Sequence, residues 1–208
     1  MPDGANHAVV FDLGGVLIDW NPRYLYRQLF ADHAEMERFL AEVCTDDWHR
    51  QHDLGADILE SCQRLAATHP AHREMIIAWA ERGEEMAAGQ IDDTVAILTS
   101  LKSAGVPCYA LSNMEPDAFA IRYDRFAFMK LFDGFVISGH EGVAKPDPQI
   151  FRILLDRFPL DPAATVFIDD AQRNTDAARE FGLRTVHFSS PAQLRQELRQ
   201  LGYCVAAP

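Results

Sequence analysis

The stretch VVFDLGGVLIDW, residues Val9–Trp20, is the most informative part of this 208-residue chain. Its apolar start leads directly into Asp12, and Gly14 and Gly15 follow closely. A short apolar run without polar alternation is typical of a parallel strand covered on both faces. The glycines allow the backbone to turn sharply and to approach a ligand closely. The stretch therefore predicts a buried strand that delivers a carboxylate to one edge of a sheet.

Four further short apolar runs predict the rest of this sheet. They are Pro107–Leu111, Phe135–Ile137, Thr165–Ile168 and Arg184–Phe188. Between them lie segments with apolar residues at helical spacing, for example the one that begins at the capping pair Asp147 and Pro148. Strands that alternate with helices of this size predict an α/β fold with a doubly wound, Rossmann-like parallel sheet.

The region from Asn21 to Gly89 differs from the rest, because it shows no convincing strand. Apolar residues recur at helical spacing in four candidate helices, which are Pro22–Phe30, Ala34–Cys44, Ile58–Ala67 and Arg73–Ala80. We therefore expect a core domain formed by residues 1–19 and 89–208, with a helical domain of residues 20–88 inserted after the first strand.

Charge and cysteine content restrict the function. The formal net charge of −12 argues against general binding of nucleic acid or of anionic membranes, although a small anionic ligand remains compatible. The four cysteines are scattered and form no CxxC pair, which is typical of reduced thiols. The N-terminus lacks the pattern of a signal peptide and no apolar stretch is long enough to span a membrane. We expect a cytoplasmic protein, monomeric or homodimeric.

Polar side chains follow the predicted strands where ligands bind in open parallel sheets. They are Asp12, Ser112 with Asn113, Lys145, and Asp169 with Asp170. Carboxylates brought together repel one another, and a divalent cation relieves that repulsion, with Mg²⁺ favoured by oxygen ligands. A lysine in the same cluster can neutralise a phosphate oxygen. The set indicates magnesium-assisted phosphoryl transfer with a carboxylate as nucleophile.

Four motifs in order, VVFDLGGVLIDW, YALSNM, GVAKPDPQIF and VFIDDAQRNTDAA, resemble those of the haloacid dehalogenase (HAD) superfamily, in the branch with a helical cap after the first motif. Within this branch the chain resembles sugar-phosphate phosphatases of the glucose-1-phosphate type. The resemblance implies a phosphomonoesterase that acts on a small phosphate ester and uses Mg²⁺. A sugar phosphate is the favoured substrate.

The resemblance also implies a role for each motif residue. Asp12 would attack phosphorus and form an aspartyl-phosphate, Ser112 would hydrogen-bond a phosphoryl oxygen, and Lys145 would neutralise charge. The metal would be bound by Asp12, Asp170, the Gly14 carbonyl and, directly or through water, Asp169. The backbone at Leu13, Gly14, Gly15 and Asn113 would contact the substrate. Asn174 stands where relatives often carry another acid, which leaves its role open.

One position departs from the phosphatase pattern. Most phosphatases of the superfamily carry a second Asp two residues after the nucleophile, where it acts as general acid and base, but this chain has Gly14. A substrate with a good leaving group would need less help, or Asp19 or a histidine of the cap would substitute. Asp19 is also a candidate cap for the helix at Pro22. The alternatives are a metal-independent 2-haloacid dehalogenase and a non-catalytic binder of phosphometabolites or proteins, but dehalogenases lack the acidic pair of the last motif.

The segment Trp48–Asp53 of the inserted region is rich in aromatic and hydrogen-bonding side chains. Arg50 and His52 are our candidates for contacts with the leaving group. The same segment is also compatible with an amphipathic helix that buries Trp48 and has no role at the site.

Overall fold

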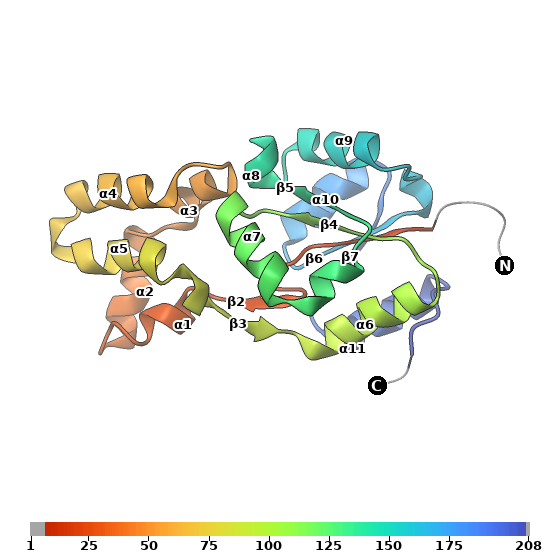
Figure 1. The fold of residues 1–208 in the computed structure, drawn as a ribbon, viewed down its shortest axis with the longest axis horizontal. Helices are drawn as coiled ribbons and strands as arrows, with labels where there is room; N and C mark the ends of the chain where they lie inside the picture. Colours follow the sequence, from red (N-terminus) through yellow and green to blue (C-terminus); the bar gives the residue numbers. More distant parts are fainter. Residues whose placement is uncertain (1–6, 207–208) are drawn as a thin grey trace.

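The computed structural model describes residues 7–206 and shows a five-stranded sheet with helices on both faces (Figure 1). The strand order is β5-β4-β1-β6-β7, and every neighbouring pair is parallel. The strands are β1 (Val9–Phe11), β4 (Cys108–Ser112), β5 (Gly134–Ile137), β6 (Val166–Asp169) and β7 (Arg184–His187). This confirms the doubly wound α/β fold that the five apolar runs predicted.

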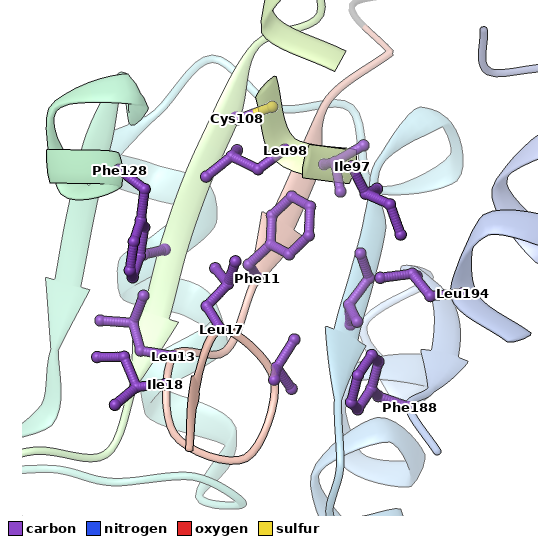
Figure 2. Close-up of a cluster of buried hydrophobic side chains, with 14 of the residues drawn as sticks. Phe11, Leu13, Leu17, Ile18, Ile97, Leu98, Cys108, Phe128, Phe188 and Leu194 are labelled. Carbon is purple, nitrogen blue, oxygen red and sulfur yellow. The ribbon is translucent and has the colours of Figure 1, made fainter. Parts of the chain in front are cut away.

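The central strand β1 is buried on both faces because its side chains alternate. Val9 and Phe11 point into a cluster with apolar residues of α6 and α11, which Figure 2 shows around Phe11. Val10 points to the opposite face, against α9 and α10. The helices of this core are α6 (Asp92–Ser103), α7 (Pro116–Arg125), α8 (Ser138–Glu141), α9 (Pro148–Arg157), α10 (Gln172–Glu180) and α11 (Pro191–Gln200), with 3₁₀ helices η3 (Ala127–Leu131) and η4 (Pro162–Ala164).

The chain between β2 and β3 forms what we call the helical insert, residues 21–86, at one end of the molecule (Figure 1). The insert has its own hydrophobic cluster, in which Tyr26 packs against Phe39 and Trp79 with ring centroids 5.1 and 5.9 Å away. Its helices are α1 (Arg23–Tyr26), α2 (His33–Glu42), α3 (Asp46–Asp53), α4 (Ile58–Thr68) and α5 (Arg73–Glu81), with 3₁₀ helices η1 (Pro70–His72) and η2 (Gly83–Met86).

Two details of this region differ from the prediction. Strand β3 (Ala87–Gln90) pairs antiparallel with β2 (Ile18–Trp20), although we expected no strand before Gly89. The pairing joins segments about 70 residues apart, and AAGQ has little β propensity of its own, so local pattern did not reveal it. The first helix is also shorter than predicted: regular helix covers only α1, and tighter turns continue to Phe30.

The other general expectations concern surface and termini. No helix in residues 7–206 is both long enough and apolar enough to cross a membrane. Cys44, Cys62 and Cys108 are buried and Cys204 is exposed, each with a free thiol. The prediction that the N-terminus is not a signal peptide concerns mainly residues 1–6, which lie outside the described range.

Candidate active site

The carboxyl ends of three adjacent strands bring the predicted site residues together. Asp12 follows β1, Ser112 ends β4 on one side, and Asp169 ends β6 on the other. The backbone N–H of Asp12 donates to the Ile168 carbonyl at 2.8 Å, which continues the β1–β6 ladder into the site. We call Asp12, Ser112, Lys145, Asp169 and Asp170 the strand-end cluster.

Lys145 is the centre of the strand-end cluster and is only 1% exposed. Its Nζ lies 2.9 Å from Asp12 Oδ2 and 2.7 Å from Asp169 Oδ2, and it donates to the Leu111 carbonyl at 2.9 Å. Burial opposes the positive charge, but the two carboxylates outweigh it and raise the pKa of Lys145 above its usual value. Lys145 is therefore a permanent cation between two acids.

Asp12 is held at both carboxylate oxygens. Oδ1 accepts the backbone N–H of Leu13 at 2.7 Å, and Oδ2 faces Lys145. Burial raises the pKa of Asp12 to about 7, against the attraction of Lys145, and repulsion from Asp169 and Asp170 adds to the rise. The single positive charge of Lys145 therefore does not balance the three carboxyl groups of Asp12, Asp169 and Asp170.

Asp169 is fully buried and surrounded by donors. Besides Lys145, it accepts the backbone N–H of Ala171 at 2.8 Å and the Nδ2 group of Asn174 at 2.9 and 3.1 Å. Asn174 is 5% exposed, and its own Oδ1 has no hydrogen-bond partner among the described residues. The structure therefore places Asn174, whose role was open, as a positioning residue for Asp169.

Asp170 occupies the position in the cluster that Gly15 leaves free. Gly15 has a φ of +71°, and a Cβ built there would lie 2.3 Å from Asp170 Oδ2. A residue with a side chain would therefore be strained and would displace the carboxylate. Within residues 7–206 the Asp170 carboxylate has no hydrogen-bond donor other than its own backbone N–H, and burial raises its pKa, with repulsion from Asp169 adding to the rise.

The acidic group suits a divalent cation. One oxygen from each of Asp12, Asp169 and Asp170 lies within 4.8 Å of the others. Three carboxylates outnumber the one ammonium group among them, and hard oxygen ligands are those that Mg²⁺ prefers. Burial raises the pKa values of Asp12 and Asp170, and repulsion from Asp169, which such an ion would relieve, adds to the rise.

The structure separates the remaining predicted residues into two groups. Gly14, Gly15, Ser112 and Asn113 line a cavity beside Asp12. The Asn113 side chain is occupied, because it accepts the N–H of Lys145 at 2.8 Å and donates to its carbonyl at 3.0 Å. Leu13 is not brought to the cavity: its side chain is in the hydrophobic cluster (Figure 2) and its N–H binds Asp12.

The cavity has a volume of about 920 Å³ and is lined by both the core and the helical insert. Arg50 is exposed and lines the cavity. His52 also lines it but is 1% exposed, with its ring edge-on to Trp48 at 4.6 Å. Burial lowers the pKa of His52 to about 4, with His49 and Arg64 adding to the effect. His52 is thus mainly a neutral histidine packed inside the insert.

Asp19 does not cap the following helix, so that prediction was wrong. Both of its carboxylate oxygens accept from the Tyr24 hydroxyl, at 2.8 and 2.9 Å. Asn21 is the residue that accepts the N–H of Arg23, at 3.0 Å. Asp19 is also absent from the lining of the cavity. The short strand β2, which the sequence did not reveal, turns Asp19 toward Tyr24.

Sequence reasoning missed several charged residues of the cavity. Asp53, Glu115, Arg122 and Arg173 line it in addition to the predicted set. Asp53 adjoins His52 in the segment that we singled out, but nothing in the local pattern distinguishes it from a surface carboxylate. The others lie on helices of the core whose orientation depends on packing.

A family model for haloacid dehalogenase-like hydrolases matches residues 7–182. The chain therefore belongs to the HAD-like hydrolase family, as the motifs predicted.

Individual relatives include phosphatases. The chain is 28% identical to the sesquiterpene phosphatase astK of Aspergillus oryzae, over 95% of this chain and 97% of the relative. It is 24% identical to a phosphorylated carbohydrates phosphatase of Thermotoga maritima, over 86% and 83% of the two chains. Among solved structures, a HAD family enzyme of Bacteroides thetaiotaomicron, in complex with magnesium and inorganic phosphate, has the same fold, with a TM-score of 0.63, 21% identity, and coverage of 88% of this chain and 93% of that one.

Proposed function

We propose that this protein is a magnesium-dependent phosphatase that hydrolyses a small-metabolite phosphomonoester through an aspartyl-phosphate on Asp12. The observation that carries the proposal is the strand-end cluster, in which Lys145 lies between Asp12 and Asp169 and Asp170 completes a group of three carboxylates. A dehalogenase gains nothing from additional carboxylates next to its nucleophile, because they repel the negative charge of that group.

In this proposal each residue around the phosphoryl group has its own role. The backbone N–H of Leu13 holds Asp12 Oδ1. The other oxygen, Oδ2, lies beside Lys145 and would attack phosphorus. Ser112 and the backbone of Gly14, Gly15 and Asn113 would orient the phosphoryl oxygens. Lys145 would neutralise the negative charge that approaches Asp12.

The metal would be held by Asp12, Asp170, the backbone carbonyl of Gly14 and, directly or through water, Asp169. Mg²⁺ supplies charge stabilisation for the phosphoryl group. Asn174 keeps Asp169 oriented for either mode, since it donates to both carboxylate oxygens.

We further propose that residues 20–88 act as a cap over the core formed by residues 1–19 and 89–208. The cavity draws residues from both parts, so that closure would exclude water from the phosphoryl group. The border of the cavity carries polar side chains and the stacked pair Trp20 and His49, whose centroids are 5.3 Å apart. Such a border suits a small polar leaving group, and the relative from Thermotoga maritima acts on phosphorylated carbohydrates, so sugar phosphates are the favoured class.

The test is phosphate release from a panel of sugar and other metabolite phosphates, with Mg²⁺ and with a chelator in parallel. We expect Mg²⁺-dependent release that Asp12→Asn abolishes. The matched control is Asp176→Asn, an exposed carboxylate on α10 that pairs with Arg179 at the surface. Halide release from 2-haloacids in the presence of chelator, with no phosphate from any ester, would contradict the proposal.

A further inference from the structure

The strand-end cluster has space for a proton-transferring group at Gly14 but no such group there. Gly14 lines the cavity, and a Cβ built on it would meet nothing within 4 Å. A phosphate ester of an ordinary alcohol needs a proton on its leaving oxygen, and the aspartyl-phosphate then needs a base to activate water. The following inference rests on the proposed function and asks which residue supplies these two roles.

Asp53, the last residue of α3, faces the same cavity from the helical insert. Its side chain is 15% exposed, and no donor in the described part of the chain makes a hydrogen bond to its carboxyl group. Nε2 of His49 lies 3.9 Å from Asp53 Oδ1, which is beyond hydrogen-bond distance. A largely buried carboxyl group without a partner is rare, because burial of an unsatisfied polar group is unfavourable.

Asp53 is held in place by its backbone rather than by its side chain. Ser138 Oγ donates to the Asp53 carbonyl and itself accepts the N–H of Met114 at 2.9 Å. Met114 is two residues beyond Ser112, so this buried connection links the end of α3 to the loop that carries the site serine. A Cβ on Gly55 would lie 2.8 Å from the Gly139 carbonyl, which shows how closely the two segments approach.

The surroundings of Asp53 make both its protonated and its ionised form accessible near neutral pH. Burial raises the pKa of Asp53 to about 6, although nearby cations oppose the rise. These cations come from four parts of the chain and are Lys145, Arg50 of α3, Arg173 of α10 and Arg122 of α7. Glu115, whose pKa burial raises to about 7, and His49 are the other titratable neighbours. A general acid and base needs access to both forms near the working pH.

The histidines of the insert are less suitable. Burial lowers the pKa of both His49 and His52 to about 4, so neither carries a proton to donate near neutral pH. His49 is stacked on Trp20 with an interplanar angle of 14°. These observations make His49 and His52 poor substitutes for the missing acid.

We propose that Asp53 is the general acid and base of this enzyme, in place of the carboxyl group that Gly14 lacks. Asp12 attacks phosphorus, the bond from phosphorus to the leaving oxygen breaks, and the Asp53 proton passes to that oxygen to give the alcohol. The Asp53 carboxylate then takes a proton from a water molecule as it attacks the aspartyl-phosphate. The bond from phosphorus to Asp12 breaks, inorganic phosphate leaves, and both carboxyl groups return to their initial states.

The first test compares two esters in the Asp53→Asn variant. For glycerol 2-phosphate, whose leaving oxygen needs a proton, we expect kcat/KM to fall about 100-fold. For 4-nitrophenyl phosphate, whose leaving group departs as a stable anion, kcat/KM should change less than about threefold, since it reports only the first step. A burst of 4-nitrophenolate should appear, because the phosphorylated enzyme accumulates when no base activates water.

The matched control is Asp57→Asn. Asp57 lies four residues further on, outside the cavity, and caps α4 by accepting the N–H of Glu60. Asn caps a helix as well as Asp, so this variant should keep its structure and both rates. The thermal midpoint and the affinity for inorganic phosphate, measured by calorimetry, should be unchanged in Asp53→Asn, which separates a loss of proton transfer from a loss of fold or site.

The second test uses the empty space at Gly14. Adding Gly14→Asp to the Asp53→Asn variant should raise kcat/KM for glycerol 2-phosphate at least tenfold above that of Asp53→Asn alone. It should also remove the burst. Equal losses for both esters in Asp53→Asn, or no loss for either, would overturn the role of Asp53 while phosphate release by the wild type still upholds the proposed function. Absence of phosphate release by the wild type from these two esters and from every ester of the panel would overturn the two proposals together.

Discussion

The two walls of the cavity differ in the hydrogen-bond partners of their buried carboxyl groups. On the sheet side, Asp12 and Asp169 are each fixed by Lys145 and by backbone N–H groups. On the insert side, no donor within residues 7–206 makes a hydrogen bond to the Asp53 carboxyl group. Partners hold a carboxylate in one orientation, whereas a buried carboxyl group without them is free to turn toward a ligand. The comparison indicates oriented carboxylates on the sheet wall and a carboxyl group without a fixed partner on the insert wall.

The two parts also differ in how they are held together. Each has its own hydrophobic cluster, with Trp20 packed against both. The contacts between them include a few polar ones, such as Ser138 with the Asp53 carbonyl and Arg122 with Glu84 at 3.1 Å. An interface of this kind suits relative motion of two preformed parts.

The largest effect is expected from removing the cation of the sheet wall. Lys145→Met leaves Asp12 and Asp169 buried without their cation, and breaking a buried pair costs about 3–5 kcal/mol of unfolding free energy. Urea unfolding followed by circular dichroism measures this loss. Lys102→Met is the control, because its pair with Asp133 lies at the surface at 2.6 Å and contributes at most about 1 kcal/mol. Similar losses in the two variants would contradict the distinction between the two kinds of pair.

The next effect concerns acid stability of the insert. The pKa of His52 is lowered to about 4, mainly by burial. Between pH 6.5 and 4, His52 is therefore protonated in the unfolded chain but neutral in the folded chain. The stability that this neutral histidine supports is complete above pH 6.5 and is lost as the pH falls toward 4, by up to roughly 3 kcal/mol. In His52→Leu the decline of unfolding free energy between pH 6.5 and 4 should be shallower, with His49 accounting for a remaining part. An unchanged slope would show that His52 is protonated in the folded protein.

A smaller effect is expected from the glycine loop of the sheet wall. Gly15→Ala places a Cβ in a left-handed conformation and against Asp170, which should cost roughly 1–2 kcal/mol and weaken Mg²⁺ binding in a calorimetric titration. Gly14→Ala serves as the comparison, because nothing lies within 4 Å of its Cβ, and its stability should change by less than about 0.5 kcal/mol. Equal Mg²⁺ affinities in the two variants would remove Asp170 from the metal site.

The smallest effect is expected from loosening the insert. Ser138→Ala removes the donor to the Asp53 carbonyl and the acceptor of the Met114 N–H, at a cost of about 1 kcal/mol. All three tryptophans, Trp20, Trp48 and Trp79, lie in or beside the insert, so their fluorescence follows that part while circular dichroism follows the whole chain. The two unfolding curves should separate in the variant. Curves that still coincide would show that this connection does not hold the parts together.

Much of the sheet wall could be predicted from the sequence. Each strand and the polar residue at its end are neighbours in the chain, so locating the apolar runs also located Asp12, Ser112 and Asp169. The cap of α9 followed in the same way, with Asp147 accepting the N–H of Gln149 at 2.8 Å. The parallel order then brings the strand ends together without further information.

The insert wall could not be predicted in the same detail. The β2–β3 pair joins two segments far apart in the chain, and it turned Asp19 away from the predicted cap toward Tyr24. The sequence made His52 a candidate for contacts with the leaving group, but packing against Trp48 makes it a neutral, buried residue. Asp53 resembled an ordinary helix-end carboxylate until Ser138 and the cavity defined its surroundings.

The sequence by itself thus determined the family, the parallel sheet and the acids at its strand ends, because these depend on short apolar runs and the residues next to them. Only the tertiary structure decided which carboxyl groups are fixed by partners and which are not. Burial and hydrogen bonding of a side chain depend on segments distant in the chain, as Lys145 shows for Asp12 and the insert shows for Asp53.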